Sequence, residues 1–389
     1  MQKFNRSKRA TLENLEQRDL FASIVVTNVN DSGAGSLRDA IALANKYTDH
    51  DTIQFKIGSG AKSIQPLKAL PYIRSPLTID GSTQPGYAGK PLIELNGAKA
   101  GYAVGLNVGG GNSTIKGLVI NRFNGIGIQV VNGGGNKIVG NYIGTDLTGS
   151  YAAPNAQKGV FLQTANNVVG GTTAADRNVI SGNNSIGVQM WTYSAKYNKV
   201  QGNYIGTDYT GNKAVPNKGS GVAINGSPFN LIGGSVAGSG NLISGNKEDG
   251  IVINQGGGHD TVIRGNIVGL NARGDTRLAN GWYGIETSQP RTVIGGTTAL
   301  ERNVVSGNVW SGIVLWLASG SDNKVTGNYV GTDITGTKDI GNWWRGIDVS
   351  NGSSNNVIGG YTAAERNIIS GNDDSGVLVY QGTNNQFIN

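Results

Sequence analysis

The stretch RNVISGN at 177–183 recurs almost unchanged three more times along the chain. The near-copies are GNLISGN at 240–246, RNVVSGN at 302–308 and RNIISGN at 366–372, spaced by about 63 residues. A second motif keeps the same spacing: GNYIGTD at 140–146 and 202–208, GNIVGLN at 265–271 and GNYVGTD at 327–333. A fixed period over this length indicates repeats stacked on one another rather than two or three separate globular domains.

Each 63-residue unit contains a shorter signal twice: a glycine, an apolar residue, any residue and a second apolar residue. Two kinds of insertion, one at 172–177 and one after Asp208, separate successive copies by unequal distances. Between Gly105 and Gly127 neither insertion is present, and a basal coil of 22 residues remains. Each long unit is therefore two coils. The signal starts at Gly105, Gly127, Gly159, Gly187, Gly221, Gly250, Gly284, Gly312, Gly346 and Gly376.

A coil of this length, with three short alternating segments bounded by Gly or Asn, is typical of a right-handed parallel β-helix. Alternation places one set of side chains inside and the other outside. Stacking at about 4.8 Å puts Asn above Asn, so that the amides can bond along the stack. We therefore predict an all-β solenoid, a right-handed parallel β-helix of about ten coils with two coils per repeat.

The segment before the repeats carries helical and strand signals of its own. Ser36 and Asp39 form a capping-box pattern, and Leu37, Ala40, Ile41 and Ala44 form one apolar face, which predicts a short helix that caps the coil stack. GSLRDAIALAN at 35–45, DTIQF at 51–55 and LTIDG at 77–81 follow one another here. This order resembles the start of bacterial, planctomycete-type β-helix repeat proteins that are exported or displayed at the cell surface. The resemblance implies the fold and an exported or surface location, and it implies no particular activity.

These signals divide the chain into three parts. Residues 1–23 are basic, lack the apolar core of an ordinary signal peptide, and contain LEQRDLFA, which resembles the end of the leader in such exported proteins. We expect a disordered export-type leader at 1–23, a cap with the first coils at 24–104, and β-helix repeats at 105–389. The final NNQFIN begins another coil segment, so we expect the chain to be part of a longer product.

Composition narrows the partners and cofactors. The 389 residues include 63 Gly, no Cys and a net charge of +7 without any basic run, so we expect no nucleic-acid partner. No stretch approaches the roughly 20 apolar residues of a membrane helix. GGGHD at 256–260 has His259 where the calcium-binding nonapeptide requires Gly. We expect no metal and no cofactor.

Repeated acidic residues are poor catalytic candidates, because catalysis requires one site. Asp146, Asp208 and Asp333 align with Asn183, and Asn271 replaces one of them, so an Asx turn explains them. Departures from the repeat are more informative. Glu286 and Asp348 occupy the same outward column two coils apart, or roughly 9.6 Å along the stack. Inverting glycosidases separate their carboxyls by about 6.5–9.5 Å, so this pair is the catalytic candidate.

Aromatic residues also depart from the repeat. Five of the six tryptophans follow residue 280, and several lie on or beside the strand that each signal glycine opens. Exposed aromatics beside amides and carboxylates suit sugar rings, which have apolar faces and hydroxyl edges. The alternative is that they pack on the insertions and simply cover the sheet. The carbohydrate-binding candidates are Trp191, Asn254, Trp282, Tyr283, Trp310, Trp316, Trp343, Trp344 and Tyr380.

Three functions remain open from the sequence. The motif sets of pectinase-type hydrolases and alginate epimerases are absent, and no acidic cluster with a nearby Arg of the pectate-lyase kind is recognisable. We therefore favour a secreted or cell-surface, non-catalytic scaffold that is adhesin-like or binds a polysaccharide or cell-surface glycan. The first alternative is a polysaccharide hydrolase or lyase of the pectin-lyase-like type that uses Glu286 and Asp348. The second is a purely structural stalk.

Overall fold

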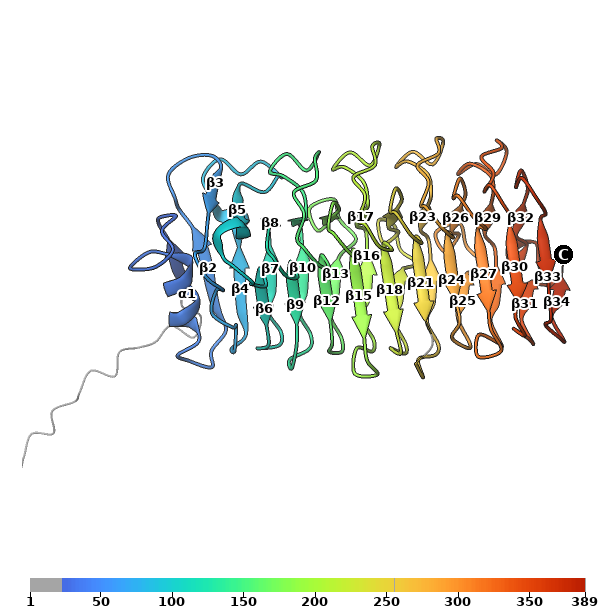
Figure 1. Ribbon diagram of the computed structural model, residues 1–389, viewed down its shortest axis with the longest axis horizontal. Helices are drawn as coiled ribbons and strands as arrows, with labels where there is room; N and C mark the ends of the chain where they lie inside the picture. The colour runs from blue at the N-terminus through green and yellow to red at the C-terminus, as the bar shows by residue number, and fades with distance from the viewer. Residues whose placement is uncertain (1–22, 255, 389) are drawn as a thin grey trace, which may run out of the picture.

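The chain forms one elongated solenoid of stacked coils (Figure 1). The computed structural model describes residues 23–254 and 256–388. Within these residues the strands form three sheets, and each strand pairs in parallel with its counterpart in the next coil. This confirms the predicted parallel β-helix. The predicted leader at 1–23 lies outside the described residues except for Ser23, where β1 begins.

The three sheets are named A, B and C in the order in which a coil visits them. Sheet A contains β1 (Ser23–Val26), β2 (Asp51–Phe55), β4 (Leu77–Asp80), β7 (Thr114–Lys116), β10 (Lys137–Val139), β13 (Val168–Gly170), β16 (Lys199–Gln201), β19 (Leu231–Gly233), β22 (Val262–Arg264), β25 (Val293–Gly295), β28 (Lys324–Thr326), β31 (Val357–Gly359) and β34 (Gln386–Ile388). Sheet B contains β3 (Lys62–Ile64), β5 (Ile93–Asn96), β8 (Leu118–Asn121), β11 (Tyr142–Ile143), β14 (Val179–Ile180), β17 (Tyr204–Ile205), β20 (Leu242–Ile243), β23 (Ile267–Val268), β26 (Val304–Val305), β29 (Tyr329–Val330) and β32 (Ile368–Ile369). Sheet C contains β6 (Leu106–Val108), β9 (Ile128–Val130), β12 (Val160–Leu162), β15 (Val188–Trp191), β18 (Val222–Asn225), β21 (Ile251–Asn254), β24 (Ile285–Thr287), β27 (Ile313–Trp316), β30 (Ile347–Ser350) and β33 (Val377–Val379). The ten strands of sheet C start one residue after the ten predicted signal glycines.

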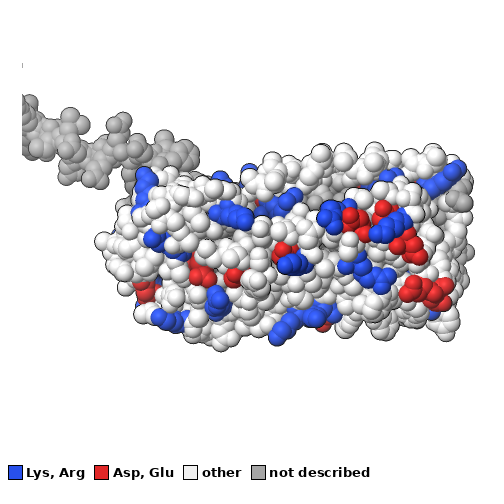
Figure 2. All heavy atoms as spheres, turned by 90° about the horizontal axis from the view of Figure 1, so that it is seen from above, with Lys and Arg blue, Asp and Glu red and all other residues white. Residues whose placement is uncertain are grey.

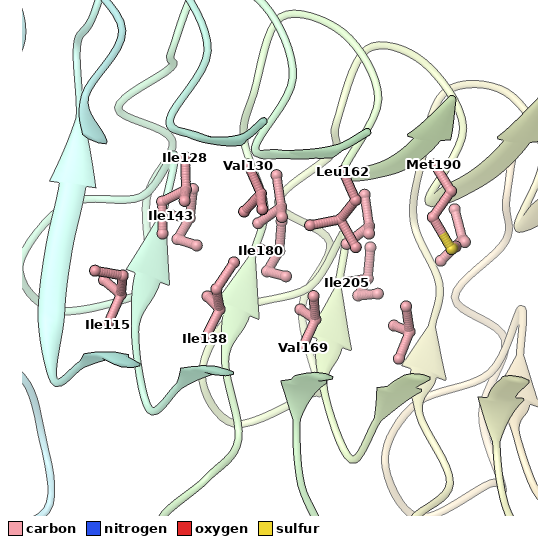
Figure 3. Packing of buried hydrophobic residues seen from close by; sticks show 14 of the residues in the cluster. Ile115, Ile128, Val130, Ile138, Ile143, Leu162, Val169, Ile180, Met190 and Ile205 are labelled. Carbon is pink, nitrogen blue, oxygen red and sulfur yellow. The ribbon is translucent and has the colours of Figure 1, made fainter. Parts of the chain in front are cut away.

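The core is a continuous column of aliphatic side chains enclosed by the three sheets (Figure 3). Ile115, Ile138 and Val169 of sheet A stand in register, one per coil, and all are buried. Residues from sheets B and C face them across the interior. Burying one such side chain contributes about 1.5–3 kcal/mol. The period-2 pattern therefore fixes which face of every strand points inward.

Asparagine ladders line two of the turns, as the sequence predicts. In each ladder the amide nitrogen of one Asn donates to the side-chain oxygen of the Asn in the next coil, at 2.8–3.1 Å. Between sheets A and B the ladder is Asn141, Asn178, Asn203, Asn241, Asn266, Asn303, Asn328 and Asn367. Between sheets B and C it is Asn155, Asn183, Asn217, Asn246, Asn280, Asn308, Asn342 and Asn372. The ladders satisfy polar groups that would otherwise be buried without partners.

The structure corrects one alignment made from the sequence. Asn183 bonds to Asn217 rather than standing in a column with Asp208, because the insertion after Asp208 leaves the stack and returns before Asn217. Asp208 instead closes that insertion as a hairpin, accepting hydrogen bonds from Thr210 Oγ1 and from the backbone nitrogens of Asn212 and Lys213. The hairpins protrude along one edge of the solenoid (Figure 1). Asp208 therefore has the turn role that the sequence predicts, within the inserted hairpin rather than in the asparagine ladder.

One corner of the coil places a residue in the left-handed backbone region in coil after coil. Asn occupies this corner at Asn166 and Asn355, as expected for that conformation. Tyr197 and Phe229 occupy it in two consecutive coils, with φ of 57° and 58°. Their rings stack with centroids 5.0 Å apart. Ring stacking therefore accompanies a backbone conformation that bulky side chains disfavour.

Each strand of sheet C from β6 to β30 begins after a glycine because another coil passes too close for a side chain. A Cβ on Gly284 would lie 2.4 Å from Val305 Cγ1 and 2.6 Å from the carbonyl oxygen of Gly312. Such contacts cannot be relieved by rotating a side chain, since one partner is backbone. The glycines thus let the chain turn tightly from the sheet B ladder into sheet C, where the candidate site lies.

The helix α1 (Leu37–Ala44) covers the first coils, as predicted. The Ser36 side chain accepts a hydrogen bond from the backbone nitrogen of Asp39, and the predicted apolar face is buried. Three short 3₁₀ segments, η1 (Gly81–Thr83), η2 (Gly97–Lys99) and η3 (Ala363–Glu365), complete the described elements. Within the described residues, α1 and the other helical segments are all too short to cross a bilayer.

Candidate functional site

The outward column of sheet C carries the two predicted catalytic carboxylates. Glu286 on β24 pairs with Val314 on β27, which pairs with Asp348 on β30. Their backbones are therefore two strand steps apart, or roughly 9.6 Å. Glu286 is half-buried, whereas Asp348 is only 2% exposed.

A groove of about 480 Å³ runs along this part of sheet C. Residues that precede the strands form one wall: Tyr283, Trp310, Trp344 and Arg345. Residues at the ends of the strands form the other wall: Trp316, Ser350, Asn351 and Tyr380. Asp348 and Leu378, from the outward column, form the floor. The groove therefore runs along the solenoid axis from Tyr283, just before β24, over β27 and β30 to β33, toward the C-terminal end in Figure 1.

The aromatic wall is built by rings that touch from coil to coil. Tyr283 and Trp310 meet edge to face with centroids 5.7 Å apart, and Trp310 meets Trp344 in the same way at 5.4 Å. Edge-to-face contacts leave ring surface free on one side. Trp310 remains 44% exposed and Tyr380, on the opposite wall, 55% exposed.

Arg345 holds Asp348 at the base of the groove. Its Nη1 lies 2.7 Å from Asp348 Oδ2, and its Nε lies 3.2 Å from Asp374 Oδ2. The guanidinium also lies over the Trp344 ring, 3.9 Å from the centroid. Ser350 Oγ donates a hydrogen bond to the other carboxylate oxygen of Asp348. The buried charge is thus paired on both oxygens, as a carboxylate removed from water requires.

A further carboxyl, Asp249, lies behind the aromatic wall. Burial and, after it, the negative charge of Glu286 together raise the pKa of Asp249 to about 7. The backbone nitrogen of Tyr283 donates to Asp249 Oδ1 at 3.1 Å, and this contact opposes the shift. Burial likewise raises the pKa of Glu286. Burial, followed by the charges of Glu286, Asp348 and Asp249, raises the pKa of Tyr283 to about 12.

Four predicted binding residues do not line the groove. Trp191 lies on β15 and meets the Phe161 ring edge to face at 6.4 Å. Trp343 lies beside the guanidinium of Arg277, 5.3 Å from the ring centroid. Trp282 is 48% exposed, and Asn254 ends β21. The structure therefore brings together six of the predicted residues, namely Tyr283, Trp310, Trp316, Trp344, Tyr380 and Asp348, with Glu286 in the same column.

Sequence reasoning missed Asp249 and Arg345, and with them the acidic cluster around an Arg. Both residues immediately precede a signal glycine. Backbone hydrogen bonds stack these positions into one column: Ser220, Asp249, Tyr283, Ser311 and Arg345. The available signal was that this position changes from Ser to charged or aromatic residues in neighbouring coils.

The described residues contain no group of three or more His, Cys, Asp or Glu side chains arranged to hold a metal ion. His259 has nearby partners that the sequence did not indicate. Its Nδ1 lies 2.6 Å from Asp260 Oδ2, and its ring meets Phe229 at 4.8 Å.

Comparisons with known proteins identify the architecture. No family model and no curated protein matches the chain. The Dettilon tailspike protein is similar over 92% of this chain and 68% of its own, with 14% identity and a TM-score of 0.51. Two other structures have lower TM-scores. A PL6 family alginate lyase has a TM-score of 0.48 and 14% identity, over 87% of this chain and 43% of its own. A surface adhesin of Streptococcus pneumoniae has a TM-score of 0.41 and 12% identity, over 94% of this chain and 89% of its own. Together with the all-parallel sheets, the tailspike likeness shows a right-handed parallel β-helix fold.

Proposed function

We propose that this protein is an exported or cell-surface β-helix whose sheet C groove binds a polysaccharide or cell-surface glycan. The observation that supports this most is the groove itself, with aromatic rings on both walls and a paired Arg345–Asp348 at its base. Ring faces suit the apolar faces of sugars, and the polar groups suit their hydroxyls.

The shape of the groove favours a chain of sugars over a single ring. Its lining residues come from four successive coils, which corresponds to about 14 Å between the first and the last. Its volume of about 480 Å³ falls within the range of roughly 300–1,000 Å³ that is common for ligand sites. Export is supported by the resemblance of the N-terminal segment to leaders of exported proteins.

Tryptophan fluorescence during titration with a panel of oligosaccharides tests the proposal. Trp310→Ala should weaken binding by roughly tenfold or more, because Trp310 joins the two other rings of its wall. Tyr151→Ala is the matched control, since Tyr151 is 73% exposed and lies outside the groove. If no glycan binds the intact protein, the binding function is wrong and the structural stalk remains.

A second candidate function is cleavage of the bound polysaccharide. It is favoured by burial, which raises the pKa of Glu286 in the direction that a general acid requires. Asp348 would supply the second carboxylate, although its oxygens are held by Arg345 and Ser350. Reducing-end and unsaturated-product assays on the same panel test this function. Activity that survives Glu286→Gln together with Asp348→Asn would exclude this pair.

A further inference from the structure

The charges around the groove indicate which glycans it accepts, if the proposed binding function holds. Arg345 is the one cationic residue among the described residues that line the groove. Four carboxyls lie on or beside it: Asp348 on the floor, Asp374 on Arg345, and Glu286 and Asp249 next to Tyr283. The site therefore has more acidic groups than basic ones.

Arg345 already pairs with two carboxylates, and this disfavours its capture by an anionic sugar. Its two ion pairs, at 2.7 Å to Asp348 and 3.2 Å to Asp374, use its Nη1 and Nε groups, and its face lies on Trp344. Only 18% of its side chain is exposed. A sugar carboxylate or sulfate that took over the guanidinium would leave Asp348, which is 2% exposed, without its cation. An unpaired buried charge is strongly unfavourable.

The four carboxyls differ in how they meet the groove. Asp348 accepts from Arg345 and Ser350, and Asp249 is 2% exposed. Glu286 is half-buried and Asp374 is 50% exposed, so both can act on a ligand in the groove. The groove therefore offers a ligand ring surface, the polar groups of Ser350 and Asn351, and neighbouring negative charge.

We infer that the groove accepts glycan chains without acidic groups and rejects uronans and sulfated glycans. Rejection of acidic chains follows from like-charge repulsion by the carboxylates beside the groove. In the face shown in Figure 2, basic and acidic groups are also interspersed and form no continuous basic stripe for a polyanion.

Affinity electrophoresis and calorimetry with two classes of oligosaccharide test the inference. The probes are neutral galactan, mannan and β-glucan fragments, and acidic polygalacturonate and alginate fragments. At least one neutral chain should bind, roughly tenfold or more tighter than any acidic chain, with an affinity that salt does not change. Trp310→Ala should abolish this binding and Tyr151→Ala should leave it intact.

The outcomes separate this inference from the proposed function. Binding of an acidic chain that depends on Trp310, as tightly as any neutral chain, would overturn the inferred rejection of acidic sugars and leave the glycan-binding function standing. Absence of binding by both classes would remove both. Neutral binding that Trp310→Ala does not change would place the ligand outside the groove and overturn the inference as well.

A charge-deletion variant tests the cause of the selectivity. Glu286→Gln with Asp374→Asn removes two carboxylates beside the groove, and should raise the affinity for an acidic fragment relative to that for a neutral one by roughly threefold to tenfold. Asp322→Asn, at an exposed acid outside the groove, is the control and should leave this ratio unchanged. The same ratio in the double variant and the parent would contradict the electrostatic explanation.

Discussion

Two sets of polar side chains run along this solenoid, and they differ in regularity. The asparagine ladders repeat one residue type in every coil, and each amide bonds to the next. The row that precedes the sheet C strands changes at each step, from Ser220 to Asp249, Tyr283, Ser311 and Arg345. Because regular backbone needs regular hydrogen bonds, repetition indicates a structural role. The change of residue type marks the place where charged and aromatic side chains form the candidate site.

The largest expected effect is a loss of stability when a buried ion pair is broken, compared with an exposed ion pair. Arg345→Ala leaves Asp348 charged and buried, and should lower the free energy of unfolding by about 3–5 kcal/mol. The control is Arg273→Ala, whose partner Asp275 is 42% exposed; it should change stability by under about 1 kcal/mol.

Urea denaturation measures both variants. Adding Asp348→Asn to Arg345→Ala should recover most of the loss, since the uncompensated charge is then gone. Equal small losses of unfolding free energy for Arg345→Ala and Arg273→Ala would mean that the Arg345–Asp348 pair contributes no more to stability than an exposed ion pair.

The next effect depends on pH. Burial raises the pKa of Asp249 to about 7 in the folded protein from 3.8, so folding favours its protonated form. Its contribution to stability is complete below about pH 4 and is lost as the pH rises to about 7, a change on the order of 4 kcal/mol. Asp249→Asn should therefore be more stable than the parent at pH 8 and similar to it at pH 4.

Urea midpoints across this pH range check the Asp249 prediction, with Asp322→Asn as the control for an exposed acid. A parent protein whose stability does not fall between pH 4 and pH 7 relative to Asp249→Asn would show that this carboxyl is hydrated. The row of residues that precedes the sheet C strands would then be an ordinary solvated surface at this position.

Substitutions in the asparagine ladders should lower the stability of the protein nearly as much, but should leave glycan binding unchanged. Asn246→Ala removes the bonds to Asn280 Oδ1 and to the carbonyl of Ile205, and takes away the acceptor of Asn217. We expect a loss of roughly 2–4 kcal/mol in unfolding free energy, with glycan affinity unchanged. Asn212→Ala, at an exposed hairpin position, should cost under about 1 kcal/mol. A loss of binding in folded Asn246→Ala would break the distinction between ladder and groove.

The smallest effect is expected at the hairpins. Asn271 occupies the position of Asp208 in another repeat and accepts a bond from the backbone nitrogen of Asp275 at 3.1 Å. Asp208→Asn should therefore cost under about 1 kcal/mol, since an amide oxygen still accepts in the turn. Thermal unfolding measures this. A larger loss than for Asn246→Ala would show that the Asp208 charge has a role beyond the turn.

Most of the fold and part of the site can be read from the sequence. The signal glycines predict where every sheet C strand begins, and the alternation that follows them places Glu286 and Asp348 in one outward column. Tyr283, Trp310 and Trp344 were also predicted to lie near this face. The alignment of Asp208 with Asn183 was wrong, because Asn183 bonds to Asn217 instead. A sequence alignment cannot show where an inserted hairpin leaves and rejoins the coil.

What the sequence alone determined is the coil, its strand register and the inward or outward face of each strand residue. These follow from local rules, namely alternation along a strand and a fixed repeat that places equivalent residues above one another. Only the tertiary structure decided that Arg345 pairs with Asp348 and Asp374, and that Asp249 is buried behind Tyr283. Those side chains precede a glycine turn, where alternation no longer sets direction. Their contacts therefore depend on how neighbouring coils of unequal length pack.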